Sequence, residues 1–93
     1  MIIEEIRKEI DEVDDKLLDL FLQRMTLSEK IAAYKISQNL PILNTAREEE
    51  ILNWAEKASP QYAEFTRAFF SALFSLSRKR QEQILNTALH DSK

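Results

Sequence analysis

Apolar side chains recur at alternating steps of three and four along the N-terminal part of the chain. The stripe consists of Ile3, Ile6, Ile10, Val13, Leu17, Leu20, Leu27, Ile31 and Tyr34. Arg24 occupies the place between Leu20 and Leu27 where an apolar residue is due. This spacing is typical of a helix that packs in coiled-coil fashion. Since no glycine or proline interrupts residues 2–38, we expect a single helix there, about 55 Å long.

The length of this helix predicts a partner chain. A compact chain of this size has a radius of gyration of only about 12 Å, so one copy does not cover both ends of such a helix. An intertwined homodimer, in which the long helices pack against their symmetry mates, is the simplest solution.

A second helix is predicted after Pro41. The segment 45–48 has the spacing of a capping box, which predicts a helix start near Thr45 with the Glu48 side chain reaching back to it. This helix is expected to end near Ala58. Its apolar face contains Ile51, Leu52, Trp54 and Ala55.

A third helix is predicted from Pro60 to about Leu89, with Ser59 as its N-cap and proline at the first helical position. One apolar stripe of this helix contains Phe65, Phe69, Leu73 and Leu76, and the other reads Phe70, Phe74, Ser77, Gln81 and Ile84. Ser77 and Gln81 therefore place two hydrogen-bonding groups on an inward face. The expected architecture is all-α, a single domain over residues 1–93 with three helices.

Composition excludes several classes of protein. The chain has 93 residues, no glycine, no cysteine and a formal net charge of −3. The lack of glycine disfavours phosphate-cradling loops and dinucleotide fingerprints. The lack of cysteine excludes disulfides and thiolate metal sites, and the net charge argues against nonspecific nucleic-acid binding. No segment resembles a signal peptide or a membrane span, so a cytoplasmic location is expected.

Arg24 is the main candidate for a binding residue. Its charge is permanent at neutral pH and needs a partner wherever the stripe is buried. That partner is either an acid across the dimer, with Glu29 and Asp19 as candidates, or an anionic ligand. Lys35 lies on the same side of the helix, roughly 16 Å further along. Arg7 lies about 25 Å before Arg24 and about 100° around the axis, so it reaches such a site only as a residue of the partner in an antiparallel dimer.

The other candidates are Arg47, Glu48, Ser77 and Gln81. With no inward histidine or cysteine, this set does not suit a nucleophile or a metal site. It suits a small dianion held by fixed donors. Each residue also has a plain structural role open to it.

Those structural roles are a snorkelling surface side chain for Lys35, a helix cap for Glu48, and a solvated first-turn cation for Arg47. Ser77 and Gln81 can form a polar layer between helices. Arg7 can form a surface ion pair, and the run 78–80 reads as a solvated basic face.

The chain resembles the all-helical chorismate mutases of type II over nearly its full length. The matching segments are 6–11, 13–18, Gln23-Arg24-Met25, Tyr34-Lys35, Pro41-Ile42 through Arg47-Glu48-Glu49, and Ser77-Arg78-Lys79-Arg80-Gln81. The resemblance implies the Claisen rearrangement of chorismate to prephenate, a unimolecular step that needs no cofactor and no metal.

The resemblance also implies roles for the candidates. Arg24 and the partner chain's copy of Arg7 would pair with the two carboxylates of chorismate. Lys35 and Gln81 would donate to the ether oxygen.

Glu48 would hold the ring hydroxyl, while Arg47 and Ser77 complete the carboxylate side. Asn44, counted among the substrate-binding residues, stands where the family often has aspartate, and Ala32 stands where some members have glycine.

Two other functions stay open. An isochorismate-pyruvate lyase would use the same scaffold and a similar cationic pocket, and Glu48 argues against it. A helical dimerisation or regulatory module without catalysis would neutralise Arg24 with an internal acid and would have no pocket.

Overall fold

The computed structural model describes residues 2–91, which form three long α-helices and one short 3₁₀ turn, with no strand among them. The elements are α1 Ile3–Ser37, α2 Thr45–Ala58, η1 Pro60–Tyr62 and α3 Ala63–Asp91. The all-helical, three-helix prediction is confirmed, with boundaries within a few residues of those expected.

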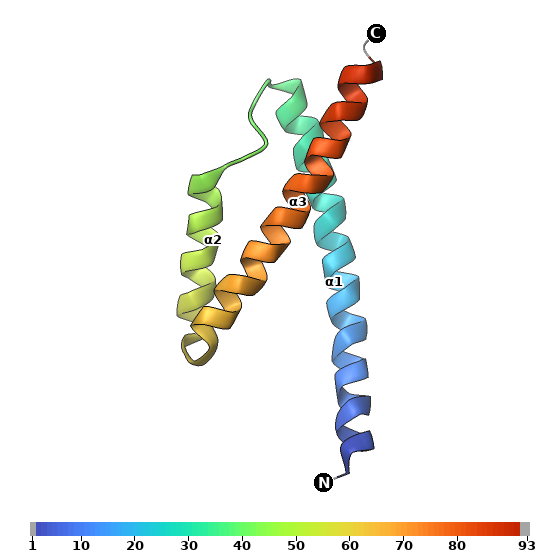
Figure 1. Ribbon diagram of the computed structural model, residues 1–93, viewed down its shortest axis with the longest axis vertical. Helices are drawn as coiled ribbons and strands as arrows, with labels where there is room; N and C mark the ends of the chain where they lie inside the picture. The colour runs from blue at the N-terminus through green and yellow to red at the C-terminus, as the bar shows by residue number, and fades with distance from the viewer. Residues whose placement is uncertain (1, 92–93) are drawn as a thin grey trace.

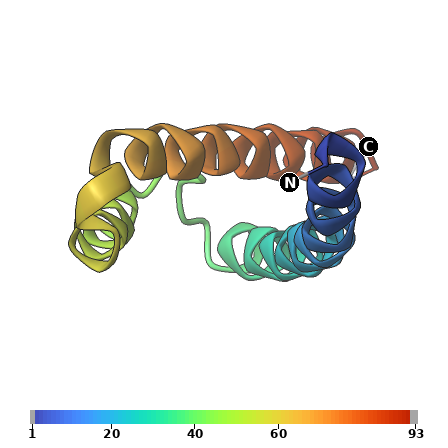
Figure 2. The same ribbon diagram turned by 90° about the horizontal axis from the view of Figure 1, so that it is seen from below.

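The three helices are joined through α3. Both α1 and α2 pack against α3, and the contacts among the described residues include none between α1 and α2. In Figure 1, α1 and α3 run upward and cross, while α2 runs downward beside the start of α3. Seen from below, α1 and α2 lie at opposite ends of α3 (Figure 2).

The turn after α1 closes without glycine. Asn39 takes a positive φ of 55°, a conformation that asparagine tolerates better than most residues. The Leu40 amide donates to the Lys35 carbonyl at 2.8 Å, and the Asn39 amide donates to the Ile36 carbonyl at 3.2 Å. This is the Schellman arrangement, in which the last free carbonyls of a helix are satisfied by the residues that leave it.

The start of α2 differs from the prediction. Its N-cap is Asn44, whose side-chain Oδ1 accepts from the Arg47 amide at 3.0 Å. The predicted capping box at Thr45 is therefore wrong, and the Glu48 side chain bonds to Arg78 instead. Asparagine is at least as good an N-cap as threonine, so the residue one position earlier takes the role.

The connection from α2 to α3 also differs. Pro60 begins a 3₁₀ turn rather than α3 itself, and the Ser59 side chain caps no helix. Its Oγ lies 2.7 Å from the Ala55 carbonyl oxygen and 2.8 Å from Thr66 Oγ1. The predicted N-cap role of the Ser59 side chain is wrong, because its hydroxyl joins the end of α2 to the first turn of α3.

The core of the protomer is small. Its buried apolar residues are Ala32, Leu52, Ala55 and Phe74, and its buried polar residues are Ser28, Ser77 and Gln81. The inward placement of Ser77 and Gln81 is confirmed. Most of the apolar stripe of α1 is exposed.

The protomer is elongated, with extents of 61 × 27 × 14 Å and a radius of gyration of 17.0 Å. A compact chain of this length has a radius of about 12 Å. The expectation that one chain leaves much of the first helix uncovered is therefore confirmed.

Candidate functional site

Arg24 lies where α1 crosses α3. Its Nη1 donates to Ser77 Oγ at 2.8 Å, and its guanidinium carbon lies 5.5 Å from the centre of the Phe74 ring. Burial lowers the pKa of the Arg24 guanidinium, but an arginine stays protonated at neutral pH. The site therefore holds a half-buried cation supported by a hydroxyl and an aromatic face.

Arg24 forms no ion pair with another described residue. The two acids that the sequence offered as partners are engaged elsewhere in the same chain. Asp19 accepts from Gln23 at 2.8 Å, and Glu29 accepts from Arg80 at 2.7 and 2.9 Å. The cation is thus available to an anion from outside the protomer.

A second polar contact lies one helical turn further along. Gln81 Nε2 donates to Ser28 Oγ at 2.8 Å, and both residues are buried, with exposed fractions of 6% and 5%. Gln81 Oε1 has no hydrogen-bond partner among the described residues. A buried amide oxygen without a partner is unusual in a folded protein and calls for an explanation.

Lys35 is half-buried near the C-terminal end of α1, and its Nζ donates to the Ile42 carbonyl at 2.5 Å. The ammonium therefore holds the loop between α1 and α2. It is therefore not the snorkelling surface side chain of its plain structural role, whose ammonium would lie in water. Arg24 and Lys35 stay on one side of α1, roughly 16 Å apart along its axis.

Two ion pairs lie near the start of α2. Glu48 accepts from Arg78 of α3 across a half-buried contact, whereas Arg47 pairs with Glu50 on the exposed surface. The prediction that residues 78–80 form a solvated face is wrong for two of the three. Arg78 bonds to α2 and Arg80 bonds to Glu29 of α1, so both arginines clamp neighbouring helices.

Two grooves meet at Arg24. The polar groove, of about 500 Å³, is lined by Arg24, Arg47, Glu50, Ile51, Trp54 and Phe70. It draws residues from all three helices and carries the Arg24 guanidinium together with the Arg47–Glu50 ion pair. Its aromatic walls contact each other, because the rings of Trp54 and Phe70 meet edge-on at 6.0 Å.

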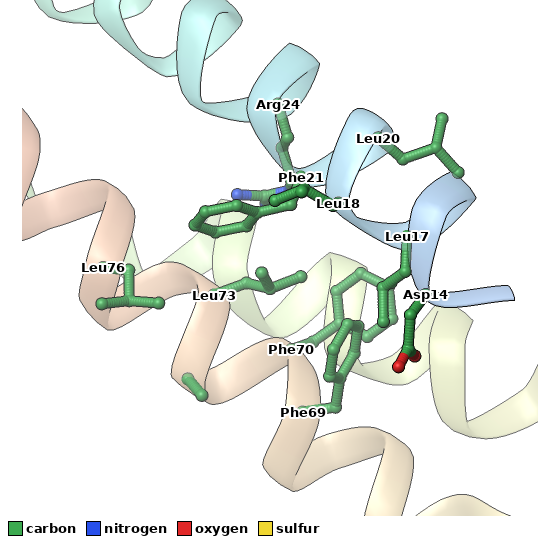
Figure 3. A pocket seen from close by; sticks show the side chains of 11 residues that line it. Asp14, Leu17, Leu18, Leu20, Phe21, Arg24, Phe69, Phe70, Leu73 and Leu76 are labelled. Atoms are coloured by element: carbon green, nitrogen blue, oxygen red, sulfur yellow. The ribbon is translucent and has the colours of Figure 1, made fainter. Parts of the chain in front are cut away.

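The apolar groove, of about 600 Å³, lies between α1 and α3 and shares Arg24 and Phe70 with the polar groove. Figure 3 shows leucine and phenylalanine side chains of the two helices facing one another across it. Its lining residues are Asp14, Leu17, Leu18, Leu20, Phe21, Arg24, Phe69, Phe70, Ala72, Leu73 and Leu76.

The candidates fall into three places. Arg24, Ser77 and Gln81 gather at the crossing of α1 and α3, and Arg47 shares the polar groove with Arg24. Arg7 is exposed near the N-terminal end of α1, lines neither groove and forms no ion pair with another described residue.

The remaining candidates serve local structure. Asn44 caps α2, Glu48 binds Arg78, and Lys35 binds the loop carbonyl of Ile42. Lys35 thus lies near the end of α1, and Asn44 and Glu48 lie at the start of α2. Whether they also touch a ligand stays a prediction.

Sequence analysis missed two residues at the site. Ser28 lies four residues after Arg24 and seven before Lys35, which places it on the same face of the helix. That spacing was the available signal. The pairing of Arg78 with Glu48 had no sequence signal, because it depends on how α2 and α3 are aligned.

The described residues contain no cluster of three or more histidine, cysteine, aspartate or glutamate side chains placed to hold a metal ion. In the same range, no helix combines the length and the apolar character that a membrane crossing requires.

The fold and the site define an all-helical protein with a half-buried cationic cleft suited to a small anion. The chain belongs to the chorismate mutase type II family, whose model matches residues 6–82.

Two curated relatives support the assignment. A chorismate mutase of Methanocaldococcus jannaschii is 36% identical over 58 residues, which is 62% of this chain and 59% of the relative. A bifunctional chorismate mutase/prephenate dehydratase of Aquifex aeolicus is 43% identical over 49 residues, which is 53% of this chain and 14% of the relative. The matches thus span about three fifths of one relative and about one seventh of the other. No solved structure matches the chain.

Proposed function

We propose that this protein is a chorismate mutase that converts chorismate to prephenate in aromatic amino-acid biosynthesis. The observation that carries the proposal is Arg24, a half-buried arginine that has no acid partner among the described residues and lies beside the Ser77 hydroxyl, one turn from the Gln81 amide. Membership of the chorismate mutase type II family supports the same conclusion.

The proposed chemistry needs only binding and fixed charge. Arg24, supported by Ser77, takes one carboxylate of the substrate, and Arg47 adds positive charge in the polar groove. These contacts hold the flexible dianion in the chair conformation from which it rearranges, so that part of the binding energy is used to orient the substrate.

Lys35 and Gln81 donate to the ether oxygen as its bond to carbon breaks. Fixed donors aimed at a developing negative charge stabilise a transition state more than the ground state. For Lys35 this role requires that its ammonium leave the Ile42 carbonyl or share its protons with it, since Nζ has three donors.

Glu48 takes the ring hydroxyl in this proposal, and Asn44 lies near it at the start of α2. The Arg78 guanidinium holds the Glu48 carboxylate in place and leaves it further lone pairs with which to accept from a hydroxyl.

A homodimer completes the proposed site. The exposed stripe of α1 and the apolar groove together form an apolar surface that one chain leaves open. Large contiguous surfaces of this kind mark sites of protein association. A second copy packed in antiparallel fashion covers them and brings its Arg7 to the second carboxylate.

The two other functions have weaker support. A lyase for isochorismate would use the same cations, but it has no evident use for the carboxylate of Glu48. A non-catalytic module predicts an internal acid for Arg24 and no pocket, whereas a groove of about 500 Å³ borders this residue. The cytoplasmic location stays a prediction of the sequence.

The test is incubation of the purified protein with chorismate, with loss of the diene absorbance followed and the product identified. Prephenate formation is the expected result. Release of pyruvate from isochorismate, without turnover of chorismate, would assign the lyase instead. Inactivity on both substrates would leave a helical dimer whose arginine is structural.

A further inference from the structure

Two side-chain hydrogen bonds follow one another at the contact between α1 and α3. Arg24 donates to Ser77 at 2.8 Å, and Gln81 donates to Ser28 at 2.8 Å. Each bond joins residues 53 positions apart, so the second lies one turn after the first on both helices. The first bond supports the Arg24 guanidinium, and the second supports the Gln81 amide.

The amide of Gln81 is only half satisfied. Its Nε2 donates to Ser28, and its Oε1 is buried without a partner among the described residues. A primary amide carries two donors on nitrogen and accepts at oxygen, while a serine hydroxyl both donates and accepts. Ser28 therefore suits both ends of the amide.

A rotation of the amide by about 180° about its last side-chain bond exchanges the two ends. Ser28 Oγ then donates to Oε1, and both N–H groups of Nε2 become available to a ligand. An amide whose oxygen accepts a hydrogen bond is also a better donor at nitrogen, because successive hydrogen bonds polarise one another.

We propose that Ser28 is a positioning residue that sets the orientation of the Gln81 amide for the rearrangement. Without ligand, Ser28 accepts from Nε2. When a ligand with an acceptor oxygen occupies the site, Ser28 donates to Oε1 and turns the nitrogen toward that oxygen. This inference rests on the proposed function, because the acceptor is the ether oxygen of the substrate.

The surroundings of Ser28 favour this role over simple packing. Ser28 lies on the face of α1 that carries Arg24 and Lys35, and it is Gln81's hydrogen-bond partner within the described chain. A residue needed only to fill this space between helices requires no hydroxyl, and alanine fits it.

The test compares Ser28→Ala with Thr26→Ala. Thr26 is exposed on the same helix, and within residues 2–91 its hydroxyl bonds only to the Leu22 carbonyl, at 3.1 Å, so it reports the loss of a hydroxyl from α1. We expect Ser28→Ala to lower kcat by about tenfold with KM changed less than about twofold, the behaviour of an interaction made in the transition state. Thr26→Ala should keep both constants. Equal kcat values for the two variants would overturn the proposal.

Two further variants separate positioning from stability. Ser28→Cys keeps a weak donor and acceptor at the same place on the side chain, so its kcat should lie between those of wild type and Ser28→Ala. In a Gln81→Ala background, Ser28→Ala should change kcat less than about twofold, because its partner is gone. A further tenfold loss there would show that Ser28 acts independently of Gln81 and would contradict the proposal.

The side-chain amide resonances of Gln81 in the ligand-free protein give a readout without turnover. They should shift in Ser28→Ala and stay in place in Thr26→Ala, and unchanged resonances in both would overturn the contact. If wild type does not convert chorismate, the proposed function fails, whereas active wild type with an equally active Ser28→Ala defeats only the positioning role.

Discussion

The two halves of α1 share one apolar rhythm and differ in their surroundings. In residues 3–20 every side chain except that of Ile6 is exposed, although the stripe is as regular there as anywhere. Residues 21–37 contain both buried residues of the helix, Ser28 and Ala32, and hold all its side-chain bonds to α3. Periodicity therefore predicts which face of a helix needs cover, but it does not say which chain provides it.

The polar interruptions of the stripe face lie in the covered half, residues 21–37, where Arg24, Ser28 and Lys35 follow one another. In the uncovered half, residues 3–20, the stripe itself is wholly apolar, and Arg7 beside it is the one candidate group. In our account the two halves belong to one site, since the uncovered half of one copy completes the covered half of the other.

The largest expected effect lies in the covered half. Arg24→Met should lower kcat/KM by about 100-fold or more, because the substrate carboxylate loses the cation that orients it and a misplaced substrate costs about 100-fold in rate. The free energy of unfolding should stay equal or rise, because exchanging a half-buried ion for an apolar side chain is often neutral or better. Steady-state kinetics and urea unfolding measure the two quantities.

Gln23→Met is the matched control for this variant. Gln23 precedes Arg24 on the exposed surface, and in the described part of the chain its side chain bonds only to Asp19, so its loss should leave kcat/KM unchanged. An Arg24→Met protein that keeps its activity and loses stability would assign the arginine a purely structural role.

The next effect lies in the uncovered half. Val13 belongs to the stripe and is 61% exposed in the protomer. Val13→Lys should raise the dimer dissociation constant by about 100-fold or more, since an unpaired charge buried at an interface costs several kcal/mol. Sedimentation equilibrium measures it.

Glu12→Lys adds a similar cation beside the stripe and serves as the control. It should leave the dissociation constant within a few-fold of wild type. If the two variants dissociate equally, the stripe is not the dimer interface and the comparison between the halves loses its meaning.

The smallest effect lies outside both halves, at the start of α2. Asn44→Ala should lower stability by about 1 kcal/mol, because the Arg47 amide loses its acceptor. For a domain of this size that corresponds to a fall in Tm of about 4–8 °C. Asn44→Asp should keep stability within about 0.5 kcal/mol, since aspartate caps equally well. Equal melting temperatures for Asn44→Ala and wild type would contradict the capping role.

The features that could be predicted from the sequence are those that depend on residues close together along the chain. The inward faces of Ser77 and Gln81 follow from spacing, because a helix fixes the directions of its own side chains. The extent of α1 and the three-helix architecture follow from the spacing together with the positions of the two prolines. These predictions agree with the structure.

The missed features depend on competition or on the alignment of helices. Asn44 displaced Thr45 as the cap, since two suitable residues stand side by side. Arg78 and Arg80 found acids on other helices, and one helix's periodicity contains no information about which residues of another helix lie opposite. Ser28 was overlooked because serine in a helix is common and its importance appears only opposite Gln81.

Mixing two inactive variants tests the central claim most directly. Arg7→Ala and Arg24→Met each disable both sites of a dimer, but a mixed dimer has one site with both arginines intact. After the chains are exchanged in equal amounts, the account predicts a return of about a quarter of the wild-type chorismate mutase rate, since random pairing gives about half mixed dimers with one good site each. A rate no higher than that of the separate variants would contradict a site shared between two copies.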